Sequence, residues 1–146
     1  VEPLKIWGQV AGGEIVPAAK PVISAQCYRV ACTDGHMAAV SVSFAKKPPQ
    51  EEILARWAAY EGLPQRCGLP SAPKQFLTYF AEDNRPQTRL DRDLEKGMGI
   101  SIGRLRQDVI FDYKFVSLSH NTLRGAAGGA VETAELLCHE GYIPYK

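Results

Sequence analysis

An arginine and a histidine in one short segment have the chemistry to bind an anion and to transfer a proton. Arg29 precedes the pair Asp34-Gly35, and His36 follows it. Asp-Gly between two apolar runs is typical of a two-residue hairpin turn. In such a turn Thr33 pairs with His36, and Arg29 then falls on the same face of the hairpin as His36. The pattern therefore predicts an arginine that binds a carboxylate beside a histidine that acts as an acid or base.

The predicted face is the more apolar one of the hairpin, which matters for both side chains. A buried arginine needs a carboxylate partner from this chain, another chain or a ligand, and a histidine beside it suits proton transfer. The alternative is a structural arginine that is satisfied locally and a histidine that belongs to the turn. A shift of one residue in the turn would also place Arg29 and His36 on opposite faces.

Four cysteines offer a second kind of chemistry, but their spacing favours neither a metal site nor a disulfide. Cys27, Cys32, Cys67 and Cys138 contain no Cys-x-x-Cys pair. Cys27 and Cys32 would point to opposite faces of one strand, because their positions differ by five, an odd number. Cys67 and Cys138 have no neighbouring group in the sequence that would activate a thiol. We expect reduced structural thiols, no metal site and no cysteine nucleophile.

Three glycines stand in the first two turns of a predicted helix that begins after Asn121. Gly125, Gly128 and Gly129 each cost roughly 1 kcal/mol relative to alanine in a helix, so another group must approach this backbone closely. A neighbouring helix and a cofactor near the helix N-terminus both fit the pattern. The spacing is not the Gly-x-Gly-x-x-Gly that follows a strand in dinucleotide-binding domains.

The elements that must position these residues form an α+β pattern. A helix opens after Pro49, and its apolar stripe contains Ile53 and Trp57. A second helix over 122–140 has apolar residues at helical spacing and ends at Gly141. Together, the predicted strands and helices indicate a mainly antiparallel sheet covered by helices. Alternating apolar residues predict the strands of this sheet over 22–30, 37–44, 75–80, 98–105 and 109–118.

The polar stretch over 82–96 balances arginines against aspartates. A solvated loop is the simplest interpretation, and the length of the stretch also allows a functional loop. Its charge pattern fits ion pairs between subunits as well as the rim of an active site, and both interpretations remain open.

Composition and charge narrow the classes of function. The 146 residues are 45% hydrophobic and 23% charged, with a formal net charge of +1, as in a single soluble domain. This charge provides no basic field for nucleic acid and no polybasic patch for a membrane, and no apolar run reaches the roughly 18 residues of a membrane span. We expect a cytoplasmic protein that binds neither. Because the chain begins at Val1 without a methionine, we also expect a fragment of a longer protein.

Several segments together resemble one enzyme family. Their order and spacing are similar to the C-terminal half of aspartate-semialdehyde dehydrogenases of the fungal and archaeal-like branch, over nearly the whole chain. The resemblance implies a single substrate-binding and oligomerisation domain over 1–146, with the C-terminal fold of glyceraldehyde-3-phosphate dehydrogenase. The segments are Cys27-Tyr28-Arg29-Val30 with Asp34-Gly35-His36, Ser71-Ala72-Pro73, the run from Arg85 to Arg92, Gly103-Arg104-Leu105-Arg106, and the run from Ser119 to Gly128.

The resemblance also implies an activity and a role for each candidate residue. Members of this family interconvert L-aspartyl 4-phosphate and L-aspartate 4-semialdehyde with NADP and phosphate, on the route to lysine, threonine and methionine. In the family an arginine, followed by six residues and a histidine, binds the substrate carboxylate, and the histidine is the general acid/base. Those roles fall on Arg29 and His36. The family's asparagine near the nicotinamide falls on Asn121, and a homodimer or homotetramer is implied as well.

The chain lacks the motifs that the family carries in its N-terminal half. No cysteine here follows an asparagine, as the family's nucleophile does, and the Gly-rich loop of the nucleotide-binding half is absent. We therefore expect a separate N-terminal domain to bind most of NADP, the helix over 121–140 to dock on that domain, and the chain alone to be inactive. A non-catalytic oligomerisation module of the same fold, and a related acyl-phosphate reductase such as the N-acetylglutamyl-phosphate type, are the alternatives.

Overall fold

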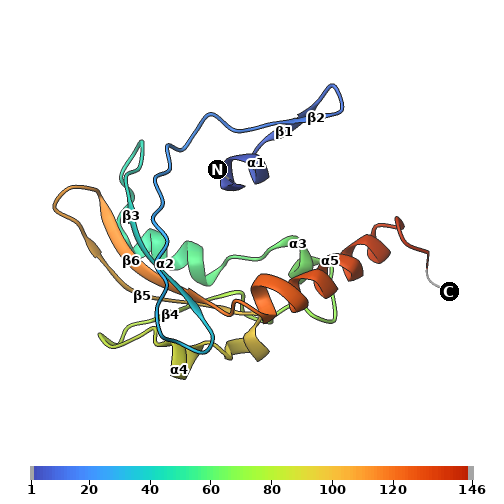
Figure 1. The fold of residues 1–146 in the computed structure, drawn as a ribbon. Coiled ribbons are helices and arrows are strands. Elements are labelled where there is room, and N and C mark those ends of the chain that lie inside the picture. Colours follow the sequence, from blue (N-terminus) through green and yellow to red (C-terminus); the bar gives the residue numbers. More distant parts are fainter. Residues whose placement is uncertain (1, 145–146) are drawn as a thin grey trace. The chain divides into compact units, whose positions relative to one another are not determined.

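The computed structural model describes residues 2–144 and divides the chain into two compact units, Val1–Ala31 and Cys32–Lys146. The described residues form both helices and strands (Figure 1). No helix in the described range is long and apolar enough to span a bilayer. The boundary between the two units falls inside the segment that carries Arg29 and His36.

The first unit contains a short helix and a hairpin. Helix α1 covers Glu2–Ile6, and strands β1 (Gln9–Ala11) and β2 (Glu14–Val16) pair antiparallel. Gly12 and Gly13 connect the strands with φ angles of 61° and 83°, which matches a tight turn that needs positive φ at both central residues. The Gly-Gly pair therefore makes the hairpin turn of this unit.

The second unit is built on a mixed four-stranded sheet in the order β3-β6-β5-β4. Its strands are β3 (His36–Val42), β4 (Leu77–Phe80), β5 (Ile100–Gln107) and β6 (Tyr113–Ser119). β6 is antiparallel to both of its neighbours, whereas β4 and β5 run parallel. The predicted α+β class is confirmed, and the four predicted strands after residue 36 form with shifted ends.

The predicted hairpin between 22–30 and 37–44 is wrong. The described residues 22–30 contain no strand, and β3 pairs with β6 instead, with His36 opposite Ser119 and Val40 opposite Phe115. A two-residue turn of the Asp-Gly type needs positive φ at both residues, but only Gly35, at 107°, has one. The hairpin geometry therefore does not place Arg29 beside His36, and Arg29 belongs to the first unit.

The choice of β6 as the partner of β3 follows from the core. Helix α2 (Gln50–Ala58) packs Ile53 against Leu105 and Tyr113, all buried. Trp57 lies edge-on against Phe115 at a centroid distance of 5.1 Å. Pairing β3 with β6 places the half-buried Val40 and Val42 beside these aromatic rings, and each contributes part of the roughly 1.5–3 kcal/mol that complete burial of such a side chain gives. The predicted helix after Pro49 is confirmed.

The polar stretch over 82–96 is more structured than a solvated loop. It contains the short helix α4 (Thr88–Asp91) and most of the 3-10 turn η1 (Leu94–Gly97). Asp91 is only 3% exposed and binds the guanidinium of Arg85. Another short helix, α3 (Leu63–Arg66), lies in the connection before β4.

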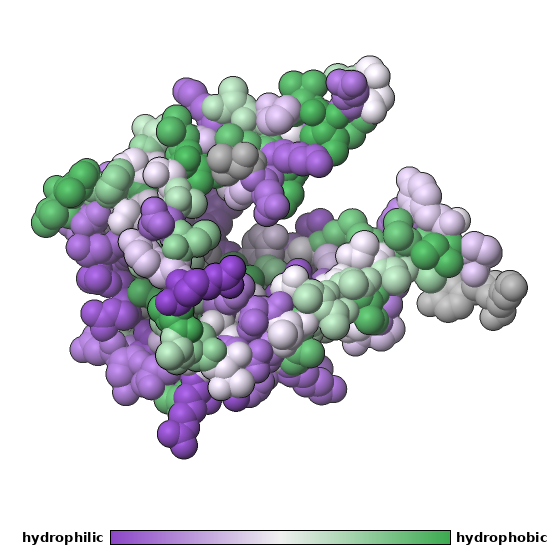
Figure 2. All heavy atoms as spheres, in the orientation of Figure 1, coloured by the Kyte–Doolittle hydropathy of each residue, from purple (hydrophilic) through white to green (hydrophobic). Residues whose placement is uncertain are grey.

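The predicted C-terminal helix forms in two parts. A π-helical turn, η2 (Leu123–Ala127), leads directly into α5 (Gly128–His139). Gly141, with φ of 79°, follows the helix, and its N–H binds the carbonyl of Cys138 at 3.1 Å. The predicted glycine cap is therefore present. Apolar side chains are exposed on both units, including Val10, Val22 and Val109, and Figure 2 shows green spheres scattered among the polar surface.

Candidate active site

The start of β3 and the end of β6 lie at the same end of the sheet, because the two strands are antiparallel. His36 is the first residue of β3 and is exposed. Opposite it is Ser119, the last residue of β6, and the chain leaves β6 through His120 and Asn121. The sheet therefore brings the predicted acid/base residue close to the start of the glycine-rich helix.

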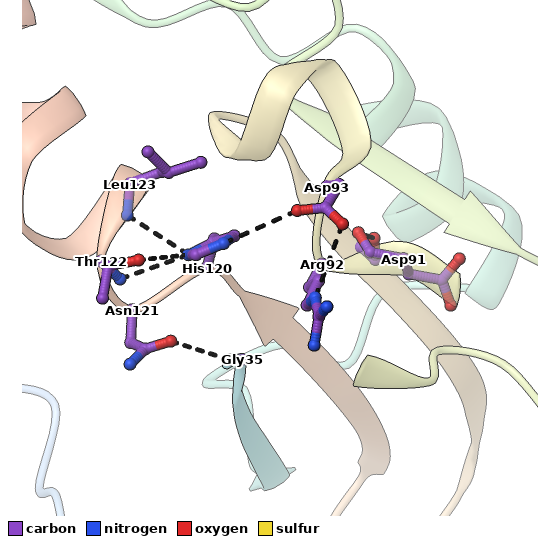
Figure 3. Close-up of polar contacts among 9 residues, drawn as sticks. Gly35, Asp91, Arg92, Asp93, His120, Asn121, Thr122 and Leu123 are labelled. Carbon is purple, nitrogen blue, oxygen red and sulfur yellow. Dashed lines mark hydrogen bonds and ion pairs between the residues drawn. The ribbon is translucent and has the colours of Figure 1, made fainter. Parts of the chain in front are cut away.

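Asn121 fixes the backbone immediately before His36. Its Oδ1 accepts a hydrogen bond from the N–H of Gly35 at 2.7 Å (Figure 3). Gly35 is buried with φ of 107°, and a Cβ there would lie 3.0 Å from Cγ2 of Thr88 and 3.1 Å from Cδ1 of Leu118. Both the φ angle and the lack of space require glycine at this position. The peptide that leads into His36 is thus held by a side chain from the other end of the chain.

His120 holds the segment that carries Asn121. Its side chain is buried, with the residue 6% exposed, and its Nδ1 accepts from the N–H groups of Thr122 and Leu123 at 3.3 Å each. Its Nε2 lies 3.6 Å from Oδ1 of Asp93. Because Nδ1 accepts, the ring proton belongs on Nε2, where it faces the carboxylate. Figure 3 shows this row of side chains between the end of β6 and the loop of Asp93.

The glycine-rich helix start is a π-helical turn. The N–H of Gly125 binds the carbonyl of His120, and the N–H of Ala127 binds that of Thr122, both at 2.9 Å. Such turns inside helices are frequent at functional sites. A Cβ on Gly128 would lie 2.5 Å from Sδ of Met98, whereas one on Gly125 would meet only the carbonyl of His120 at 3.6 Å. The close approach predicted for this backbone is made at Gly128 by Met98, and Gly125 has space beside it.

An ion pair supports the loop next to this site. Asp91 binds Arg85 through both carboxylate oxygens, with Nε to Oδ2 at 2.8 Å, and accepts the N–H of Gln87 at 2.7 Å. Burial of Asp91 favours its neutral form, but the hydrogen bonds from Arg85 and Gln87 outweigh it and hold the pKa of Asp91 below its usual value. The guanidinium also stacks on Phe80 at 4.3 Å from the ring centroid. Asp91 immediately precedes Arg92 and Asp93. The ion pair of Asp91 with Arg85 therefore anchors the loop from which Asp93 reaches His120.

The structure brings some of the predicted site residues together. His36 and Asn121 meet through Gly35. Arg29 is exposed in the first unit, and its association with His36 stays a prediction. Sequence reasoning missed His120, Asp93 and the tether at Gly35. A histidine at the boundary between a strand and a glycine-rich helix is a signal for a capping side chain, but its partner Asp93 is set only by the fold.

Comparison with known proteins defines the class of domain. The family described as semialdehyde dehydrogenase, dimerisation domain, matches residues 1–124. The chain therefore belongs to this semialdehyde dehydrogenase family. This confirms the resemblance that the motifs indicated.

Particular relatives are aspartate-semialdehyde dehydrogenases. The one from Schizosaccharomyces pombe is 48% identical over 84% of this chain, and the one from Methanothermobacter thermautotrophicus is 40% identical over 93% of it. The crystal structure of the Candida albicans enzyme with NADP is 40% identical over 97% of this chain, with a TM-score of 0.86. This chain spans 35%, 40% and 41% of the lengths of these three proteins.

Proposed function

We propose that this chain is the substrate-binding and oligomerisation domain of an NADP-dependent aspartate-semialdehyde dehydrogenase. The reaction interconverts L-aspartyl 4-phosphate and L-aspartate 4-semialdehyde with phosphate and NADP as partners. The observation that carries the proposal is the bond from Gly35 to Asn121, because it holds two of the three residues with assigned roles, His36 and Asn121, at one end of the sheet. The relatives with this name match over most of the chain.

Each assigned residue has a chemical task. Arg29 binds the carboxylate of the substrate through its guanidinium, which forms two parallel hydrogen bonds to such a group. His36 is the general acid/base: when the semialdehyde is oxidised it accepts the proton of the O–H group at the reacting carbon as hydride leaves, and in the reductive direction it returns that proton to the oxygen. The nucleophilic cysteine comes from a part of the enzyme outside this chain, since no cysteine here follows an asparagine. The 146 residues alone are therefore inactive.

The start of the C-terminal helix suits the nicotinamide end of NADP, which accepts hydride in the oxidative direction. Oδ1 of Asn121 is occupied by Gly35, while no hydrogen bond from its side-chain N–H₂ is found among residues 2–144. That amide group is a donor for a carbonyl oxygen. A Cβ on Gly125 would meet only the carbonyl of His120, at 3.6 Å, so no neighbouring side chain in the described part of the chain covers this exposed glycine of the π-helical turn. Most contacts with NADP come from a separate nucleotide-binding domain.

Exposed apolar side chains support docking with further protein. Leu123 and Leu137 are exposed on the C-terminal helix, and Val109 and Ile110 are exposed in the loop before β6. Exposed apolar side chains of this kind become buried where another protein surface covers them. The helix is proposed to dock on the nucleotide-binding domain, and a second copy of the chain is proposed to pair with this domain in a homodimer or homotetramer.

The test uses the full-length protein. It is expected to reduce NADP when given L-aspartate 4-semialdehyde and phosphate, whereas the 146-residue chain gives no signal. N-acetylglutamate semialdehyde serves as the comparison substrate and is expected to react far more slowly. A full-length protein that preferred the acetylated substrate, or that reduced no NADP with either, would overturn the proposal.

A further inference from the structure

Three side chains that ligate transition metals converge at the ends of two helices, away from the site described above. The thiol of Cys67, the imidazole of His139 and the carboxylate of Glu140 each place one ligand atom within 4.8 Å of the other two. Cys67 follows α3, whereas His139 and Glu140 end α5. The sequence pattern gave no sign of this cluster because its members come from distant segments.

One face of α5 holds the segment that follows α3. Glu132, Glu135 and His139 are spaced i, i+3 and i+7, so they share that face. Glu135 accepts hydrogen bonds from the N–H and the hydroxyl of Ser71 at 2.9 and 2.8 Å, and α3 lies beside α5 (Figure 1). His139 is one turn further along the same face. The approach of Cys67 to His139 is thus fixed by a two-point attachment one helical turn away.

The backbone around the three ligands is held in place. Cys67 ends α3, with its N–H bound to the carbonyl of Leu63 at 2.9 Å, and Gly68 reverses the chain with φ of 61°. Glu140 ends α5, with its N–H bound to the carbonyl of Leu136 at 2.9 Å. The C-terminal end of a helix carries partial negative charge, which favours a cation there.

The side chains of the cluster have no competing partners within residues 2–144: neither a hydrogen bond nor an ion pair engages the Cys67 thiol, the His139 imidazole or the Glu140 carboxylate. Thiolate, imidazole and carboxylate are the donors that Zn²⁺ takes, and three protein ligands leave a fourth position for water. Ordinary carboxylate clusters lack the sulfur and nitrogen donors that select such an ion. His139 and Glu140 are exposed, so an ion has access from solvent.

We propose that Cys67, His139 and Glu140 form a binding site for a divalent transition metal of the zinc type. On binding, the Cys67 thiol loses its proton to solvent and the imidazole binds in its neutral form. The ion would join α3 to α5 and so stabilise the folded state. This site is independent of the dehydrogenase proposal, and it differs from the sequence-based expectation of no metal site, which stays a prediction until the ion is tested.

Titration with Co²⁺ tests the site, because cobalt bound to a thiolate in tetrahedral geometry has a charge-transfer band in the near ultraviolet and strong visible bands. The protein, kept reduced with a non-chelating phosphine, is expected to develop these bands and to lose them when Zn²⁺ is added. Cys67→Ser removes the near-ultraviolet band. His139→Ala removes a direct ligand. Losing only an outer-shell partner already costs roughly tenfold in metal affinity, so we expect this variant to bind at least tenfold more weakly.

Cys138→Ser is the matched control, since Cys138 adjoins His139 in the sequence but lies outside the cluster. This variant is expected to keep the bands and the rise in Tm that Zn²⁺ produces, and Cys67→Ser is expected to lose both. Circular dichroism of each variant without metal verifies the fold. The proposal is overturned if the unaltered protein shows no thiolate band with Co²⁺, or if Cys67→Ser binds Co²⁺ as tightly as Cys138→Ser does.

Discussion

The side-chain oxygen of Asn121 accepts the backbone N–H of Gly35 at 2.7 Å, and the next residue is His36. This bond joins the first strand of the sheet to the start of the C-terminal helix. Asn121 itself follows His120, whose Nδ1 binds the first N–H groups of that helix. The position of His36 therefore depends on the helix start as well as on the sheet.

Replacing Asn121 separates two roles of its side chain. Asn121→Ala leaves the Gly35 N–H without a partner, and an unsatisfied buried donor costs about 1–3 kcal/mol. Asn121→Asp keeps an acceptor oxygen at this point but removes the N–H₂ donor. In urea unfolding we expect the alanine variant to lose stability by about this amount and the aspartate variant to lose much less. Amide hydrogen exchange at Gly35 should accelerate only in the alanine variant.

If both variants lose the same stability, the Gly35 bond does not hold this segment. In the full-length enzyme, turnover of the Asn121→Ala and Asn121→Asp variants tests the N–H₂ group separately from the Gly35 bond. An aspartate variant that folds well but turns over slowly would assign catalytic importance to the N–H₂ group, as a nicotinamide contact requires.

The sheet illustrates which parts of the fold the sequence predicts. Alternating apolar residues predicted the four strands of the second unit, because one face of each packs on the core and the period of two is then imposed. The pairing partner of β3 was not predictable in this way. Asp34-Gly35 is a strong local turn signal, but β3 pairs with β6, where Val40 lies opposite Phe115 and Val42 opposite Tyr113. The hairpin formed instead at Gly12-Gly13, where both residues have positive φ.

The candidate site shows the same division between local and distant information. Motif resemblance assigned roles to Arg29, His36 and Asn121, and only the fold revealed that Asn121 reaches the residue before His36. His120 was missed because nothing near it in the sequence marks Asp93 as its partner. The interplay of Arg29 with His36 remains a prediction from the resemblance, since the hairpin that would have joined them does not form.

Arg29 and His36 should have different kinetic signatures in the full-length enzyme. Arg29→Leu removes a carboxylate ligand, so we expect it to raise KM for the semialdehyde far more than KM for NADP. His36→Ala removes an acid/base group, and we expect turnover to fall by roughly 10²- to 10⁴-fold. Steady-state rates with each substrate varied in turn measure both effects. Identical changes in the two variants would contradict separate roles.

The packing of α2 on the sheet predicts a stability difference between two identical substitutions. Ile53 is 8% exposed in the core with Leu105 and Tyr113, whereas Ile110 is 81% exposed in the loop before β6. Ile53→Ala should lower the free energy of unfolding by about 2–5 kcal/mol because it leaves a cavity, and Ile110→Ala should change it by less than about 0.5 kcal/mol. Urea unfolding measures both. Equal losses would show that α2 does not cover the sheet in solution.

The ion pair of Asp91 with Arg85 predicts how stability depends on pH. Burial of Asp91 opposes its ionisation, but the hydrogen bonds from Arg85 and Gln87 prevail and lower its pKa below the ordinary 3.8. The folded state therefore holds the proton less tightly than the unfolded chain does. The stability that the pair contributes is fully present above the unfolded pKa and is lost as the pH falls through the folded one.

Asp91→Asn should therefore lower Tm at neutral pH, and its difference from the unaltered protein should shrink below about pH 4. Asp83→Asn, at an exposed carboxylate, is the control and should leave Tm unchanged at both pH values. The Asp91 variant keeps some sensitivity to acid, because Lys114, through a hydrogen bond at 2.9 Å, also lowers the pKa of Asp108. A Tm difference for Asp91→Asn that stayed constant from neutral to acidic pH would show that its effect comes from lost packing and not from the charge of the carboxylate.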